Sequence, residues 1–560
     1  MNSSQDDAPA GAAALQRFYP LRRAEEIVLL ALREGDVARV GLRRPLVPSI
    51  ATSLRGAFVS FLARGGTGDL EAGRSLQIMG AWIEGRVDLH DATVAESIWF
   101  YRCVFDATPR LDGARVHGSA TFSDCLMPGL RAEDSKVADD FALNSGTTVR
   151  NEVRLARALI GRHLDLSRAR LRSAERSPVT WRRRVTADAA RIGGNVMLGG
   201  GFEADGEVSF AGARIGGSLR ADGARLSGQL DASGVRGVAL TLERSYVAGS
   251  VALDAGFAAA GTVDLTGMQI DGDLRCSGAD FDVYGEAAFS GARALLLDRA
   301  RVGGTLAVAN LNNPLAGASL LGTRAGSLLD DASSWGDRLV LDGFRFRQFA
   351  PGAPTTAATR LQWLALQEPS HLDLDFRPGP WRELIAVLRR MGHHESAREV
   401  AVARERHLSR IGRVAGGASA AERGLSRLAH GLLGALAGYG YRPARVVGAM
   451  AAVWLGCGAL YVAATQAGAL SPAGIAAQVA PPVRPFVLSL DLLLPIVDLQ
   501  QESRWAPLIH SQAGAATPIW QLATRAAAWF EVVFGWIASL VLIGALAGLF
   551  DRDQRERRTG

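Results

Sequence analysis

The side chains with the most chemical potential lie in a short apolar segment near the carboxyl end of the chain. The segment PFVLSLDLLLPIVDLQQESRW holds Asp491, Asp498, Glu502 and Arg504 among aliphatic residues. Carboxylates beside so apolar a run are unfavourable unless they face water, a cation or an arginine. We therefore treat these four residues as a candidate functional loop. Three interpretations are open: an amphipathic surface helix, a re-entrant or pore-lining segment, and a surface that packs against a partner.

The sequence lacks the motifs of nucleotide binding and of nucleophilic catalysis. Neither a G-x-x-x-x-G-K-[ST] loop nor a G-x-S-x-G elbow occurs. Glycine runs such as Gly193-Gly194 open no predicted helix, and Gly438-Tyr439-Gly440 lacks the third glycine of a dinucleotide fingerprint. We predict no catalytic residue and no cofactor, and we expect a function other than catalysis.

Metal and redox chemistry are not indicated either. The cluster His393-His394-Glu395 lacks the H-E-x-x-H spacing, because Arg398 stands four residues after His394. The four cysteines show no C-x-x-C spacing and are predicted to be structural thiols: Cys103, Cys125, Cys276 and Cys457. Paired carboxylates such as Asp330-Asp331 are predicted to lie in solvated corners. We predict no metal site.

Composition limits the classes of partner. The 560 residues include 64 glycines, and only 7% are aromatic. The net charge is +6, and Lys136 is the single lysine, so nearly all of the basic residues are arginine. No basic cluster is interleaved with aromatic residues for base stacking, so we predict no nucleic-acid partner.

A repeat of 55 residues organises the chain between about 92 and 311. One apolar column is Phe105, Ile160, Ile215 and Ile270, which we predict to lie in a common core. Six further columns keep the same register over four units, among them Val137, Ile192, Val247 and Val302. Such a repeat predicts an array in which each unit buries its apolar face against its neighbours.

A finer pattern indicates short strands. Apolar pairs spaced by two residues, such as Leu219/Ala221, recur about every 11 residues and are separated by glycines and small residues. Short strands with regular turns predict a mainly β protein with a right-handed β-solenoid. A helical solenoid is the alternative, but dense glycine argues against it.

Changes of pattern divide the chain into six segments. We predict a disordered amino terminus (1–20), a helical cap (21–68), the β-solenoid (69–348), a linker (349–359), a helical hairpin with a juxtamembrane region (360–440) and a two-span membrane domain (441–560). The cap would cover the open first coil, where an exposed strand edge would otherwise be free to pair.

Two uncharged stretches are long enough to cross a bilayer. They run from Val446 to Thr465 and from Val532 to Phe550. Arginines are dense before the first and after the second, and sparse between them, so the positive-inside rule predicts cytoplasmic termini and a cytoplasmic solenoid. No signal peptide is evident at the amino terminus. We expect a multi-pass protein of the bacterial inner membrane.

Several stretches together resemble one bacterial membrane-protein family. They are RGAFVSFLARGG, the A-R-I-G-G-x-L coils, PWRELIAVLRRMGHHESAREV, GYGYRPARV and FVLSLDLLLPIVDLQQESRWAP. Members of that family couple a pentapeptide-repeat-like or bactofilin-like β-solenoid to a carboxy-terminal pair of transmembrane helices. The family is often labelled "membrane-associated oxidoreductase", a label that carries no catalytic residue over to this sequence.

These observations favour a membrane-tethered scaffold or protein-interaction platform. Its expected partners are the lipid bilayer and a protein of unknown identity, and association with further copies of the chain is an open alternative. An oligomeric channel or sensor that uses the acidic loop is the first alternative. A membrane-associated oxidoreductase, implied by the family label alone, is the second.

Overall fold

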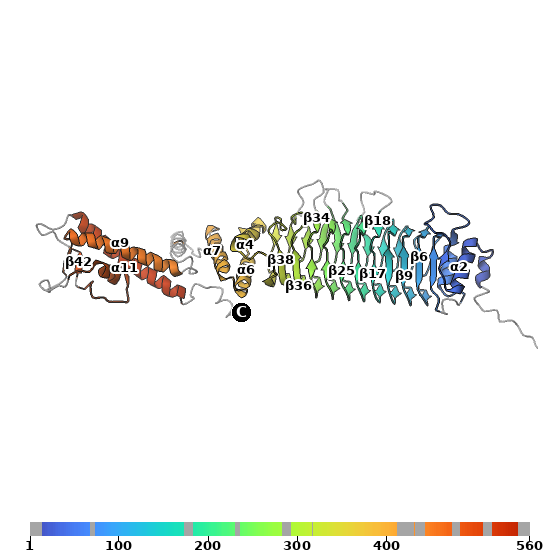
Figure 1. Cartoon of the computed structure of the whole chain (residues 1–560), viewed down its shortest axis with the longest axis horizontal. Helices are drawn as coiled ribbons and strands as arrows, with labels where there is room; N and C mark the ends of the chain where they lie inside the picture. The colour runs from blue at the N-terminus through green and yellow to red at the C-terminus, as the bar shows by residue number, and fades with distance from the viewer. Residues whose placement is uncertain are drawn as a thin grey trace, which may run out of the picture. The chain divides into compact units, whose positions relative to one another are not determined.

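A computed structural model describes residues 14–67, 73–172, 183–229, 236–282, 293–315, 317–373, 375–411, 431, 443–472, 482–503, 505–507 and 518–546. The chain divides into two compact units, Met1–His393 and His394–Gly560 (Figure 1). Each unit is described by itself.

Unit 1 contains three sheets of parallel strands, with 21, 10 and 9 strands. The chain passes through β8 (Arg115–Val116), β9 (Ala120–Ser123), β10 (Leu126–Met127) and β11 (Leu130–Arg131), and then enters β12 (Lys136–Val137), which pairs in parallel with β8. β8 and β9 belong to the 21-stranded sheet, β10 to the 10-stranded sheet and β11 to the 9-stranded sheet. We call the stretch from the start of β8 to the start of β12 one pass of the chain. Each pass adds strands to all three sheets.

The 21-stranded sheet consists of two ladders that merge at β36 (Arg301–Val308). The first ladder is β5 (Thr93–Val94), β8, β12, β16 (Leu159–Ile160), β20 (Arg191–Ile192), β24 (Arg214–Ile215), β28 (Tyr246–Val247), β32 (Gln269–Ile270), β36, β38 (Arg324–Asp330) and β40 (Arg345–Phe349). The second is β1 (Ala38–Arg39), β3 (Leu76–Met79), β6 (Ile98–Tyr101), β9, β13 (Phe141–Asn144), β17 (Leu164–Asp165), β21 (Val196–Met197), β25 (Leu219–Arg220), β29 (Val251–Ala252) and β33 (Leu274–Arg275).

The two smaller sheets are built in the same way. The 10-stranded sheet is β2 (Ser53–Arg55), β4 (Trp82–Glu84), β7 (Val104–Phe105), β10, β14 (Thr148–Val149), β18 (Arg170–Leu171), β22 (Glu203–Ala204), β26 (Arg225–Ser227), β30 (Ala258–Ala260) and β34 (Asp280–Asp282). The 9-stranded sheet is β11, β15 (Val153–Arg154), β19 (Arg183–Thr186), β23 (Glu207–Ser209), β27 (Val238–Thr241), β31 (Thr262–Asp264), β35 (Leu295–Leu296), β37 (Ala318–Ser319) and β39 (Leu339–Val340).

The predicted fold class is wrong. The chain is 29% helical and 27% strand, so it is not mainly β, and its strands lie in three flat parallel sheets rather than in a closed solenoid. The physical reason is the shortness of the strands, many of which have two residues. Most of each pass is spent in turns, where positive-φ positions such as Gly212 (φ 64°) and Arg157 (φ 58°) turn the backbone sharply.

The strand pairings explain the spacing of 55 residues and correct one member of the predicted core column. Along the first ladder Ile160 pairs with Ile192 and Ile192 with Ile215, which are steps of 32 and 23 residues. On its other side Ile160 pairs with Val137, so no 32-residue step precedes Ile160 on the ladder. The residue 55 positions before Ile160 is Phe105, which therefore lies off this ladder, in β7 of the 10-stranded sheet.

The amino-terminal segment covers the first strands of the stack. α2 (Arg23–Glu34) and α3 (Gly56–Ala63) are joined by a segment that contributes β1 and β2, so the predicted helical cap also adds two strands. Glu25 is fully buried, and the Arg55 guanidinium hydrogen-bonds to its carboxylate. Burial raises the pKa of Glu25, but the hydrogen bonds from Arg55 and Arg22 outweigh it, so the pKa is lowered overall.

The other end of unit 1 carries α4 (Ala357–Ala365), α5 (Pro369–Leu372) and α6 (Gly379–Arg390). The Arg360 guanidinium donates two hydrogen bonds of 2.7 Å to the Asp330 carboxylate, and both side chains are 1% exposed. Trp335 Nε1 donates a third to Asp330, at 2.9 Å. Asp330 is therefore a buried ion-pair residue, and its predicted position in a solvated corner is wrong.

Unit 2 is helical. Its elements are α7 (His394–Arg410), α9 (Pro443–Gln466), α10 (Pro485–Leu493) and α11 (Pro518–Leu546), with a two-stranded antiparallel pairing of β41 (Leu470–Pro472) and β42 (Trp505–Pro507). Residues 444–466 and 519–544 are long and apolar enough to cross a membrane, with mean hydropathies of 1.9 and 2.0. Only 17% of each apolar window is buried, whereas a core helix of a soluble protein is mostly buried.

We predict that Arg360→Met strongly destabilises unit 1. The change leaves the Asp330 carboxylate buried without its cation, which costs about 3–5 kcal/mol. The measurement is urea unfolding of the detergent-solubilised chain. Asp330→Leu combined with Arg360→Met should be less destabilised than the single change. Arg275→Met, which breaks an exposed pair with Asp254, is the matched control and should leave the midpoint nearly unchanged. Equal midpoints for Arg360→Met and Arg275→Met would contradict the assigned role.

Candidate functional site

A row of basic side chains crosses the first ladder of the 21-stranded sheet. The first residues of β8, β12, β16, β20, β24, β28, β32, β36, β38 and β40 are paired in register, one strand to the next. We call these ten positions the basic row. Leu159, Tyr246 and Gln269 occupy three of them, and the other seven are basic and exposed: Arg115, Lys136, Arg191, Arg214, Arg301, Arg324 and Arg345. None of the ten is acidic.

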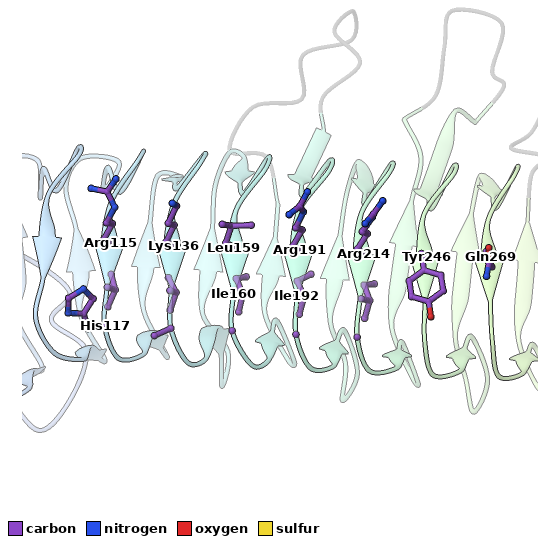
Figure 2. A pocket seen from close by; sticks show the side chains of 17 residues that line it. Arg115, His117, Lys136, Leu159, Ile160, Arg191, Ile192, Arg214, Tyr246 and Gln269 are labelled. Atoms are coloured by element: carbon purple, nitrogen blue, oxygen red, sulfur yellow. The ribbon is translucent and has the colours of Figure 1, made fainter.

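The basic row borders an open groove. Figure 2 shows Arg115, Lys136, Leu159, Arg191 and Arg214 in order on successive strands. The groove has a volume of about 960 Å³ between Arg115 and Gln269, and a second stretch of about 410 Å³ continues from Gln269 to Arg345. Because parallel strands lie about 4.8 Å apart, nine steps make the row about 43 Å long.

The middle of the groove floor is formed by small residues two positions beyond the row, including Gly161, Gly193 and Gly216. His117, Asp271 and Arg347 occupy the equivalent positions elsewhere along the groove. Close stacking of the strands requires these glycines. A Cβ added at Gly193 would lie 2.1 Å from the Gly161 carbonyl oxygen, and one added at Gly216 would lie 2.4 Å from the Gly193 oxygen. The same requirement keeps the floor low beside the long basic side chains, so the groove stays open.

The basic residues of the row lack the ion pairs that several arginines on other ladders of unit 1 form. On other ladders Arg275 pairs with Asp254 at 2.9 Å, and Arg154 pairs with Glu152 at 2.8 Å. Among the described residues, no ion pair or side-chain hydrogen bond joins a basic residue of the row to an acidic group. Like charges on adjacent strands repel one another, by about 0.9 kcal/mol at 4.8 Å in water. An anion in the groove would relieve this repulsion.

The predicted acidic loop lies in unit 2, and Asp491 is its buried member. Its carboxylate accepts backbone hydrogen bonds from Leu499 (2.6 Å), Gln501 (2.8 Å) and Glu502 (2.8 Å). Asp491 is 5% exposed. The carboxylate thus holds the chain that follows α10, and backbone N–H groups of the loop satisfy its charge.

Neither Asp498 nor Glu502 contacts this carboxylate through its side chain. Asp498 is exposed and accepts a hydrogen bond from the Gln500 backbone at 2.7 Å. Glu502 is exposed and lines a cavity of about 370 Å³ together with Tyr461, Trp505, Arg525 and other residues. Arg504 lies outside the described residues.

The segment that carries the loop is not a surface helix. α10 packs against both α9 and α11. The Trp454 indole N–H donates to the Phe486 carbonyl oxygen at 2.8 Å, and a Cβ at Gly535 would lie 2.0 Å from the Leu493 oxygen. Glycine at 535 therefore permits the close approach of α10 to α11. Small residues have this role where membrane helices pack closely.

A second buried carboxylate, Glu531, escaped the sequence analysis. It is fully buried within α11, where it accepts hydrogen bonds from the Tyr461 hydroxyl at 2.8 Å and from the Ser489 hydroxyl. The uncharged stretch that predicted the second span begins after this residue, whereas the helix begins at Pro518. The signal that could have found it is an acidic residue enclosed by apolar runs on both sides.

The predicted core residues Phe105, Ile160, Ile215 and Ile270 are all buried, at 3% exposure or less. Ile160, Ile215 and Ile270 lie on one ladder, whereas Phe105 packs with Phe100 at a ring-centroid distance of 5.3 Å. They form part of the frame that carries the row.

The cysteines do not form a reactive centre. Cys103, Cys125 and Cys276 are buried, and Cys457 is half-buried. Burial raises the pKa of Cys276 to about 12 and also raises the pKa of Cys125, so these thiols stay protonated near neutral pH. No group of three or more metal-ligating side chains occurs within the described ranges.

No family model, curated protein or solved structure matches the chain.

We predict that Asp491→Asn loosens the loop after α10, whereas Asp498→Asn does not. Asparagine has a single acceptor oxygen and would turn its own amide N–H toward the backbone donors, and hydrogen bonds to a charged group contribute about 1.5–3 kcal/mol. The measurement is cleavage after Glu502 by a glutamate-specific protease in detergent. Cleavage should accelerate several-fold in Asp491→Asn and match the parent in Asp498→Asn. Equal rates in both variants would show that the carboxylate does not hold the loop.

Proposed function

We propose that the protein is a membrane-anchored scaffold. Its two long apolar helices fix the chain in a bilayer, and the stacked sheets present the basic row to an anionic partner. The observation that carries the proposal is the low burial of α9 and α11: only 17% of each apolar window is covered by the rest of the protein. Surfaces of this size and apolarity require lipid or another apolar covering.

The arrangement of unit 2 supports insertion in a bilayer. α10 has nine residues and spans about 14 Å, so it is too short to cross the hydrocarbon core. It contacts α9 at Trp454 and α11 at Gly535, both near the middle of a long helix. In a membrane α10 would therefore be a re-entrant segment held between two spans. Such a segment is tolerated where protein buries its polar backbone.

The distribution of arginine supports a cytoplasmic position for unit 1 and for both termini. Arginines are frequent before α9 and after α11, and only Arg484, Arg504 and Arg525 occur between about 466 and 531. The positive-inside rule places arginine-rich flanks in the cytoplasm. The basic row would then face the cytoplasmic compartment.

A channel or sensor is a second candidate, favoured by Glu531. A carboxylate within a spanning helix is expensive and commonly marks an ion or proton path. Here two hydroxyl groups satisfy it, which equally fits a structural role. Ion flux into liposomes that holds for the parent chain and is lost in Glu531→Gln, with assembly unchanged, would favour the channel.

We predict that the full chain stays in the membrane pellet after alkaline carbonate extraction and that detergent releases it. The matched control is a chain that ends at residue 411, before the apolar helices, which should be recovered without detergent. Release of the full chain by carbonate would contradict membrane insertion.

We also predict opposite labelling of two single cysteines by an impermeant thiol reagent on intact cells. With Cys457 replaced by alanine, a cysteine at Gln512, between the two helices, should react. A cysteine at the exposed His117 of unit 1 should react only after lysis. The reverse pattern would show that the proposed topology is inverted.

A further inference from the structure

We infer that the basic row binds the phosphate headgroups of an anionic membrane surface. The inference rests on the proposed anchoring and adds a second membrane contact to it. The row is straight, about 43 Å long and exposed at its seven basic positions. A planar array of phosphates is a surface that such a row can meet along its whole length.

The charge pattern calls for an anion from outside unit 1. Arg191 and Arg214 are adjacent on the ladder, as are Arg301 and Arg324, so each pair places two cations side by side. Several arginines elsewhere in the unit are paired with carboxylates, as in Arg275 with Asp254. Asp271 and Glu383 line the second stretch of the groove, but no described acidic side chain forms an ion pair with a basic residue of the row.

A lipid surface fits the row better than a nucleic acid does. Proteins that hold single strands combine basic residues with aromatic platforms for the bases. Tyr246 is the one aromatic residue among the ten positions, and its hydroxyl donates to Asp271 at 2.6 Å. The remaining side chains offer charge without devices for reading bases. Headgroup phosphates require charge alone, and each basic residue near an anionic leaflet adds to the attraction.

Anchoring by unit 2 strengthens the argument. Once unit 2 is inserted, unit 1 meets the lipid surface at a high local concentration. Weak headgroup interactions are then sufficient for a second contact. Long arginine side chains along one edge of the groove can reach several phosphates, while the low floor beside them leaves room for headgroups.

The test uses the full chain reconstituted in vesicles, with a fluorophore on one introduced cysteine and a nitroxide on the lipid headgroups. The label is placed at His117→Cys, beside the row, or at Asp106→Cys, which follows β7 in the 10-stranded sheet; both parent residues are exposed. Cys457 is replaced by alanine, and the other native cysteines are buried. In vesicles with about 30% anionic lipid, quenching at position 117 should be several-fold stronger than at position 106. It should fall to the level of position 106 in neutral vesicles or in about 0.5 M NaCl, where the screening length is about 4 Å.

Two variants with equal net charge separate the row from general basicity. Quenching at position 117 should be lost when four residues of the row are changed to glutamine: Arg191, Arg214, Arg301 and Arg324. It should persist when four exposed arginines at the 10-stranded sheet are changed: Arg150, Arg170, Arg172 and Arg225. Equal loss in both variants would overturn the inference.

The two proposals fail in different ways. If the chain does not float with the vesicles, the anchoring is wrong. If it floats and position 117 is not quenched on anionic lipid, the anchoring stands and the lipid contact is wrong. Row-dependent binding of fluorescent DNA or polyglutamate to the detergent-solubilised chain, without lipid-dependent quenching, would assign the row to a nucleic acid or an acidic protein and overturn the inference.

Discussion

Parallel pairing in register is the constraint on which unit 1 depends. Each strand hydrogen-bonds to the strand of the next pass, so a residue at one position lies about 4.8 Å from its counterparts. Apolar positions such as Ile192 and Ile215 become a continuous core. Small positions such as Gly193 and Gly216 become the floor of the groove, where the backbones of neighbouring strands nearly touch. The same register turns a basic position into a line of cations.

In unit 2 the corresponding constraint is close contact around α10. Gly458 leaves room for the Phe486 ring and Gly535 for the Leu493 carbonyl, so the short helix is held between the two long ones. Its polar residues face inward: Ser489 donates to Glu531, and Asp491 accepts from the backbone beyond the helix. The two carboxylates are thus satisfied by hydroxyl and amide donors within the described part of the unit.

The sequence revealed the elements better than their arrangement. The spacing of the apolar columns located the buried ladder positions, because apolar residue types recur in the sequence with the 55-residue period. It misplaced Phe105, because the period of 55 joins steps of 23 and 32 residues, which the sequence does not mark separately. Strand content was overestimated, since period-two pairs do not show that many strands end after two residues. The Arg360–Asp330 pair joins residues 30 apart and has no local signal.

The candidate sites, too, were only partly predictable from the sequence. The acidic loop was recognisable because charge interrupts an apolar run, yet the sequence could not separate a buried Asp491 from an exposed Asp498. Glu531 was excluded by the very criterion that found the spans. The basic row was missed because its members are 21 to 32 residues apart, and only strand pairing brings Arg191 beside Arg214 or Arg301 beside Arg324.

A row of cations on a rigid sheet differs physically from a basic tail of the same charge. In a tail, repulsion is relieved by extension, and binding must order the backbone at a cost in conformational entropy. In the row, folding already fixes the backbone at each position and holds like charges side by side. Part of the repulsion is therefore present before any partner arrives, and an anionic surface removes it without ordering the chain. Such a row is suited to recognising a flat, regularly charged surface, and two helices of the same chain are long and apolar enough to cross a membrane.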